Sequence, residues 1–196
     1  IFVPPGNDKL VVIGHGGRAS NQSISVGPDS ASSNQSVAIG SLSEANVDSA
    51  ITMGFRATAF GDRAISVGRR SGRDFSAIDS IGIGFNSQRQ GDRGISIGCG
   101  TGEAGQTRAD AIDTIAIGTN AHASLNDVSG SNSISIGSNA VTTGSNGVAI
   151  GKATSTTGYN GVSIGSNASA SGDNCIAIGN TASINGNTLT TIIGLI

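Results

Sequence analysis

Charged side chains are the most informative irregularity of this 196-residue chain, because they are crowded into its first half. Residues 1–113 hold ten of the 11 Lys and Arg residues and 11 of the 13 Asp and Glu residues. Asp62-Arg63 and Asp92-Arg93 occupy the same position in two repeats, which favours ion-pair ladders within or between chains. The alternative is an arginine-rich band that binds an anionic ligand, such as a sulfated glycan or an acidic receptor. The candidate ligand-binding residues of this band are Arg56, Arg69, Arg70, Arg73 and Arg89.

The histidines and cysteines are too few and too widely spaced to form a metal or catalytic site. Cys99 and Cys175 lie about five repeats apart, roughly 24 Å at ~4.8 Å per repeat, whereas a disulfide needs Cα atoms within about 7 Å. His15 and His122 are separated further still, and alternation directs His122 outward. No nucleophile, base and orienting acid converge, and phosphate-loop and calcium-nonapeptide patterns are absent. We therefore predict no enzyme, no metal and no cofactor.

The composition is that of a thin β structure. Gly accounts for 31 residues, aromatic residues for 3% and charged residues for 12%, and Ile greatly outnumbers Leu, which favours strands. A formal net charge of −2 argues against nucleic acid or an anionic membrane as partner. No apolar run approaches the ~18 residues of a membrane span, so we expect no direct membrane insertion.

A four-residue phrase, aliphatic–small–aliphatic–Gly, recurs along the chain with an underlying period of 14. Small residues follow three and five places after the Gly, and a Gly or Asn follows near seven. This pattern predicts a strand, a Gly corner, a shorter strand and a second turn in each repeat. Thirteen copies would stack into a parallel β-solenoid roughly 60 Å long. We divide the chain into an N-terminal lead-in or cap, residues 1–10, and the roll, residues 11–196.

Alternation along each phrase decides which side chains face the interior of the roll. We expect the aliphatic residues to point inward and the middle residue, such as Ser25, Ala38 or Ser163, to point outward. We also expect the small residues of the shorter strand, such as Ala57 and Ala59, to point inward. The outward Ser/Ala row would then pack against other copies of the chain, or else form a plain solvated sheet surface.

Two repeats are longer than the rest and supply further candidate sites. Extra residues intrude around residues 106–110 and around residues 126–130, and insertions in solenoids often emerge as binding loops. The candidate ligand-binding residues here are Arg108, Asp110, Asn126 and Asp127. The alternative is tolerated variation at the surface.

Several phrases resemble the head repeats of YadA-like trimeric autotransporter adhesins. The S-V-A-I-G phrase of that family is reproduced by residues 36–40, and residues 160–172 follow the rest of its repeat. The resemblance covers residues 11–194. It implies an all-β, left-handed parallel β-roll of about 13 rungs and a homotrimer. It also implies display on the outer membrane of a bacterium, and binding of host extracellular-matrix proteins or host-cell receptors.

The sequence also departs from the family, and other functions compete with adhesion. Neither coiled-coil heptads nor the barrel anchor of the family is evident, so we expect a head fragment whose surface attachment lies elsewhere. A phage tail-fibre or similar host-recognition segment is the main alternative. An ice-binding solenoid would need a regular Thr row, and a left-handed β-helix acyltransferase a hexapeptide rhythm; the sequence shows neither.

Overall fold

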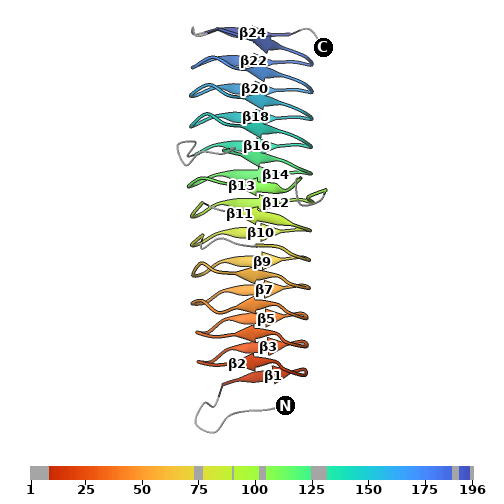
Figure 1. Ribbon diagram of the computed structural model, residues 1–196. Helices are drawn as coiled ribbons and strands as arrows, with labels where there is room; N and C mark the ends of the chain where they lie inside the picture. Colours follow the sequence, from red (N-terminus) through yellow and green to blue (C-terminus); the bar gives the residue numbers. More distant parts are fainter. Residues whose placement is uncertain are drawn as a thin grey trace.

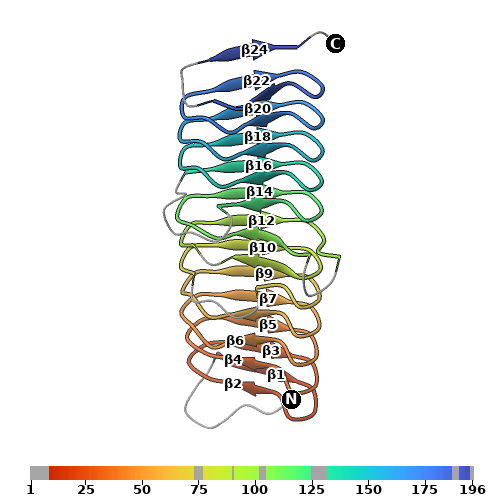
Figure 2. The same cartoon turned by 45° about the horizontal axis from the view of Figure 1, so that its top comes forward.

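The computed structural model is a stack of short parallel strands wound into a roll (Figures 1 and 2). It describes residues 9–72, 77–89, 91–101, 105–124, 132–186 and 190–194. Every regular element of these residues is a strand, and the strands form sheets of 13, seven and four members. Thirteen stacked strands correspond to twelve turns of the chain. The structure thus confirms the parallel β-roll expected from the repeat.

The 13-stranded sheet, which we name the long sheet, consists of the three-residue strands that contain the aliphatic phrase. Its strands are β1 (Val11–Ile13), β3 (Ile24–Val26), β5 (Val37–Ile39), β7 (Ile51–Met53), β9 (Ile65–Val67), β10 (Ile81–Ile83), β12 (Ile95–Ile97), β14 (Ile115–Ile117), β16 (Ile134–Ile136), β18 (Val148–Ile150), β20 (Val162–Ile164), β22 (Ile176–Ile178) and β24 (Thr191–Ile193).

The opposite wall of the roll is made by shorter strands in two sheets. The four-stranded sheet contains β2 (Arg18–Ala19), β4 (Ala31–Ser32), β6 (Glu44–Ala45) and β8 (Thr58–Ala59). The seven-stranded sheet contains β11 (Ser87–Arg89), β13 (Thr107–Ala109), β15 (His122–Ala123), β17 (Val141–Thr142), β19 (Ser155–Thr156), β21 (Ser169–Ala170) and β23 (Ser183–Ile184).

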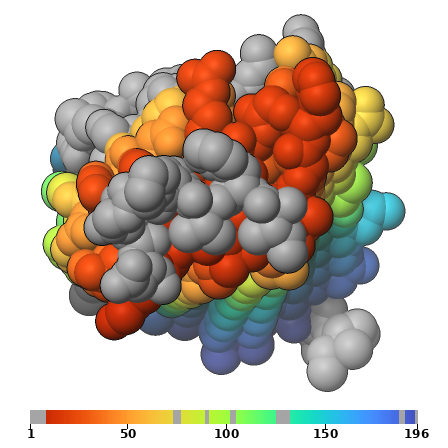
Figure 3. Space-filling view, turned by 90° about the horizontal axis from the view of Figure 1, so that it is seen from below, coloured from red at the N-terminus to blue at the C-terminus, as the bar shows by residue number. Residues whose placement is uncertain are grey.

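Strand pairing follows the sequence repeat. Val148 pairs with Val162 in the long sheet, and Ser155 pairs with Ser169 in the opposite sheet. Each residue therefore lies over its equivalent in the next repeat, and residues of one repeat position form a column along the roll. Seen from the N-terminal end in Figure 3, the rungs lie behind one another in sequence order.

The orientation expected for the long-sheet strands is wrong. Their middle residues face the interior: Ser25, Ala38 and Ser163 are fully buried, whereas Ile51 and Met53 on either side of a middle residue are exposed. The interior is narrow, because strands of only two or three residues lie opposite the long-sheet strands, and between the end rungs the middle residues that face it are Ser, Thr, Ala or Gly. The larger aliphatic side chains are left outside. The Ser/Ala row is therefore the lining of the roll and not a surface between chains.

Hydroxyl groups explain why Ser and Thr alternate with Ala in this lining. The Ser163 hydroxyl donates to the Ser155 carbonyl oxygen at 2.9 Å, and that of Ser96 donates to the Thr107 carbonyl oxygen at 2.7 Å. These bonds join the two walls of the roll and satisfy buried polar groups. The inward direction expected for the short-strand residues is confirmed, since Ala57 and Ala59 are buried.

Two turns close each rung, and we name them by their place along the chain. The first turn follows the long-sheet strand and begins with a Gly; Gly165, for example, has φ +129°, and a Cβ there would lie 2.4 Å from the Gly179 carbonyl oxygen. The second turn precedes the next long-sheet strand and holds another positive-φ residue, such as Asn146 or Asn160. Asn146 donates its side-chain amide to Asn160 Oδ1 at 3.0 Å. Glycine corners are thus confirmed.

Cys99 and Cys175 form no disulfide with each other, as their separation predicts. Cys175 is fully buried and packs with Ala170 and Ala177 inside the roll, whereas Cys99 is exposed on a first turn.

Candidate functional site

The largest distinctive surface of the molecule is the outer face of the long sheet, which we name the aliphatic face. Ile51, Met53 and Ile83 expose 37%, 42% and 38% of their surface, and Ile150 and Ile164 on later rungs resemble them. Each strand places two side chains on this face. At about 50 Å² each they amount to on the order of 1,000 Å², above the few hundred Å² that monomers usually expose in one patch. A surface of this kind is typical of a subunit interface.

A second distinctive surface lies on the first turns of three successive rungs, and we name it the Arg–Phe ridge. It consists of Phe55, Arg56, Arg69, Arg70 and Phe85. The Arg69 guanidinium lies 5.9 Å from the ring centre of Phe55 and 5.6 Å from that of Phe85. Arg56 lies 5.8 Å from the same Phe55 ring. The ridge is therefore a stack of cation–π contacts.

The second turns carry a different arrangement of charge, an ion-pair ladder. Arg63 Nε donates to Asp79 Oδ1 at 2.5 Å, and Arg93 Nε donates to Asp113 Oδ1 at 2.6 Å. The second nitrogen of each guanidinium bonds the other carboxylate oxygen at 2.9 Å. Hydrogen bonds from the arginines lower the pKa of Asp79 and of Asp113. The ladder expected from the repeated Asp-Arg pairs is confirmed within the chain.

A third cluster lies on the seven-stranded sheet, where Arg108 pairs in register with His122. Arg108 Nε donates to Asp110 Oδ1 at 3.1 Å, while the other Asp110 oxygen is buried without a hydrogen-bond partner. Burial raises the pKa of Asp110, although Arg108 opposes the shift. His122 Nε2 lies 2.6 Å from the Gln106 carbonyl oxygen. Burial lowers the pKa of His122, and the charge of Arg108 lowers it further against the hydrogen bond to Gln106.

This cluster corrects one expectation about the longer repeats. Residues 107–109 do not belong to an inserted loop but form β13, which pairs in register with β11 and β15. Arg108 therefore projects from a sheet, and His122 faces outward as alternation predicts. The other expected loop, with Asn126 and Asp127, lies outside the described residues.

Of the nine predicted ligand-binding residues, those that the structure describes do not form a single site. Arg56, Arg69 and Arg70 lie on the Arg–Phe ridge, and Arg108 and Asp110 lie two rungs beyond Arg70, on or just after β13 of the seven-stranded sheet. Arg73 lies outside the described residues, and Arg89 is described only as the last backbone position of β11. Among the described residues, no group of three His, Cys, Asp or Glu side chains could hold a metal ion.

Sequence reasoning missed two of these features. The alternation of the phrase marks two faces but not which one points outward, so the aliphatic face was assigned to the interior. Phe55 and Phe85 stand at the same repeat position as Arg69, directly after the phrase glycine. That shared position is the signal from which their stacking could have been predicted.

Part of the chain matches a known protein family. The family model described as YadA head domain repeat, in two copies, matches residues 48–71, 109–127, 129–154 and 157–182, which is just under half of the chain. No curated protein matches the chain. Among solved structures, the collagen-binding domain of the Yersinia adhesin YadA shares 18% identity over 96% of this chain and 82% of its own, with a TM-score of 0.35.

The roll is thus a repeat solenoid of stacked two-strand rungs, the class that its strand pairing defines by itself. The matched segments are YadA head repeats, so the roll carries repeats of the YadA-like head type. Among the described residues, no helix is long and apolar enough to cross a membrane.

Proposed function

We propose that this chain is the head of a bacterial surface adhesin that acts as a homotrimer and binds a host extracellular-matrix protein or cell-surface receptor. The aliphatic face is the observation that carries the proposal. It runs along the whole long sheet, it is too large and regular for a solvated surface, and the YadA head repeats supply its context.

Burial of this face explains assembly in physical terms. Three copies placed with their long sheets toward a common axis would bury the aliphatic side chains at equal heights, because a closed ring keeps equivalent rungs level. About 1,000 Å² per chain exceeds the ~800 Å² per partner of a standard stable interface. The walls made by the short strands would then form the outside of the trimer.

The outward wall is the surface that we assign to the host ligand. Its side chains are mostly small and polar, and Arg108, held by the buried Asp110, is a fixed cation on it. Three identical walls would present each weak contact three times. Such multivalency raises the effective concentration and hence the avidity without new contacts.

The mass of the head in solution tests the assembly. Light scattering coupled to size exclusion at low micromolar concentration should give three times 19.2 kDa. A monomer with an intact far-ultraviolet β spectrum would overturn the trimer. Binding to immobilised collagen, fibronectin and laminin tests the adhesive role, with an Arg108→Ala variant to test the assigned wall and a Lys152→Ala variant as control. Failure of all three proteins and of cell attachment would overturn adhesion.

A further inference from the structure

The Arg–Phe ridge is a binding surface distinct from the outward wall. We propose that it binds a linear sulfated polysaccharide of the glycosaminoglycan class. The inference rests on the proposed adhesin role, because it adds a ligand class to the same head.

Free positive charge is the first argument. The arginines of the second turns and Arg108 are each paired with an aspartate of the same chain. By contrast, Arg56, Arg69 and Arg70 form no ion pair with any described residue. Glu44 is an exposed acidic residue on β6, in register with Thr58 of β8. It forms no ion pair with a described residue, so it does not neutralise these arginines. As far as the described residues go, three guanidinium groups on two neighbouring rungs therefore remain available to an anion.

Restriction of the arginine side chains is the second argument. The Arg69 guanidinium lies between Phe55 and Phe85, with 5.9 Å and 5.6 Å to the ring centres. Arg56 contacts the same Phe55 ring at 5.8 Å. An arginine held in this way loses less rotamer freedom on binding than a mobile surface side chain does. The rings thus act as positioning residues for the guanidinium groups.

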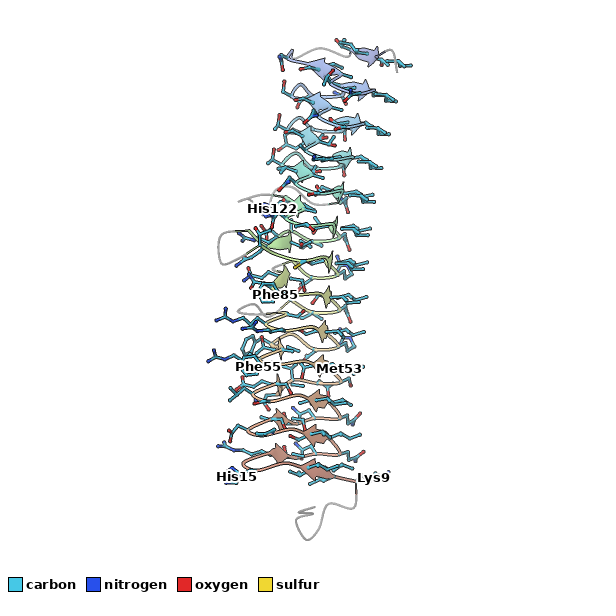
Figure 4. The ribbon with its side chains drawn as sticks, turned by 90° about the vertical axis from the view of Figure 1, so that its right-hand side faces the viewer. Lys9, His15, Met53, Phe55, Phe85 and His122 are labelled. Atoms are coloured by element: carbon cyan, nitrogen blue, oxygen red, sulfur yellow. The ribbon has the colours of Figure 1, made fainter. Side chains whose placement is uncertain are left out.

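Accessibility in the assembled head is the third argument. Figure 4 places Phe55 and Phe85 on the side of the roll that carries His122, opposite Met53 on the aliphatic face. Phe55 exposes 42% of its surface. The ridge therefore remains open to solvent when the aliphatic face is covered by other chains.

The shape of the ridge favours a polysaccharide over an acidic peptide or a folded acidic receptor. Its three cations form a compact cluster on two neighbouring rungs about 4.8 Å apart: Arg56 and Arg70 stand at the same repeat position, and Arg69 precedes Arg70 on the second rung. A sulfated polysaccharide carries several sulfate groups on neighbouring sugars, so a short stretch of it can meet all three guanidinium groups. Guanidinium groups bind the oxygens of sulfate in pairs, as they do those of phosphate, and the exposed ring edge of Phe55 offers an apolar contact to a sugar.

The proposal is tested by titrating the intact head with a fluorescent, size-defined heparin oligosaccharide and following its anisotropy. The test variant is Arg56→Gln/Arg69→Gln/Arg70→Gln. The matched control is Lys152→Gln, since Lys152 follows its phrase glycine as Arg69 does but lies several rungs away. We expect the triple variant to bind at least tenfold more weakly and the control to bind like the parent chain. If each of the three cations releases counterions from the polysaccharide as it would from single-stranded nucleic acid, the affinity of the parent chain for heparin should fall on the order of a hundredfold per tenfold rise in salt.

A second substitution examines the stacking itself. Phe85→Leu keeps all three charges but removes one ring from Arg69, and it should weaken binding severalfold with little change in salt dependence. Equal binding by the triple variant and the parent, or no binding by the parent, overturns the proposal. Equal or tighter binding of a poly-glutamate peptide of matched charge overturns the ligand class. Dissociation of the triple variant into monomers would instead place the arginines in the subunit interface, which also overturns it.

The two proposals fail separately. A head that remains trimeric and binds matrix proteins but ignores heparin refutes the ridge alone. A head that binds heparin as a monomer refutes the trimer and leaves the ridge assignment in place.

Discussion

Removal of one aliphatic side chain from the long sheet should weaken the proposed trimer by an amount that its exposure predicts. Ile150, the last residue of β18, exposes 37% of its surface in the single chain. That fraction corresponds to about 60 Å² of apolar surface, worth about 1.5 kcal/mol at ~25 cal/mol per Å² when it is buried. Ile150→Ser should therefore cost about 4.5 kcal/mol per trimer.

This cost has a measurable consequence in dilution experiments. It corresponds to a rise of about a thousandfold in the trimer dissociation constant, at 1.4 kcal/mol per tenfold. Because three chains assemble, the concentration at half-dissociation varies as the square root of this constant and should rise about thirtyfold. Sedimentation velocity over a dilution series measures that concentration directly.

The matched control is Val141→Ser in β17, which changes a similar side chain on the outward wall. It should leave the half-dissociation concentration unchanged within a factor of two. Equal shifts for both variants would mean that the substitutions act on folding of the single chain. No shift for Ile150→Ser would refute burial of the aliphatic face, and far-ultraviolet circular dichroism checks that each variant keeps its strands.

Three further predictions concern the roll itself. Gly165→Ala should destabilise the roll by several kcal/mol, since a Cβ would meet the Gly179 carbonyl oxygen at 2.4 Å. Gly186→Ala, where nothing lies within 4 Å of an added Cβ, should leave the stability unchanged. Equal melting temperatures for the Gly165→Ala and Gly186→Ala variants would contradict this account. Inside the roll, Ser163→Ala should cost about 1 kcal/mol by loss of one hydrogen bond, whereas Ser163→Leu should prevent cooperative thermal unfolding by overpacking; an outward Ser163 would tolerate both. Burial in the folded chain lowers the pKa of His122 below its ordinary 6.5. The stability that the neutral imidazole contributes is therefore fully present above pH 6.5 and is lost as the pH falls from 6.5 through the lowered pKa. The free energy of unfolding of the parent, measured by denaturant titration, should therefore fall relative to that of His122→Gln between pH 7.5 and pH 5.5. A constant difference between the two would contradict the burial of the imidazole.

The repeat makes much of the fold predictable from sequence. A 14-residue period determines which strands pair, and the glycine of each phrase marks the first turn. The small residues of the shorter strands were correctly placed inside. Repeated Asp-Arg pairs indicated a ladder, and the chain contains one. The left-handed winding implied by the resemblance stays a prediction.

The direction of the long-sheet side chains could not be predicted by the same reasoning. The expectation that large apolar residues lie inside assumes that one chain must cover its own apolar surface. Here the interior is lined mainly by small residues such as Ser25 and Ala38, and hydroxyl groups such as that of Ser25 bond backbone carbonyl oxygens within it. The same two-residue alternation fits both orientations, so only the width of the roll distinguishes them.

The candidate site was only partly predictable, because position in the rung matters more than proximity in sequence. Arg63 and Arg69 are six residues apart, yet one lies on a second turn beside Asp79 and the other on a first turn between two rings. A cluster of arginines in the sequence does not show that its members belong to two different repeat positions. Assignment of each residue to its repeat position separates them.

The exact register between rungs also has a consequence for how such a gene can change in length. Among the 14-residue repeats, such as those of β18 and β20, loss or duplication of 14 codons removes or adds one complete rung, and every remaining residue keeps its column. A change of another size displaces all later columns unless a turn or loop absorbs the difference, as happens in the 13-residue repeats between β1 and β5. Unequal recombination between neighbouring 14-residue repeats therefore yields rolls of different length in which the remaining rungs are unchanged, and natural length variants in this part of the chain should differ by whole multiples of 14 residues.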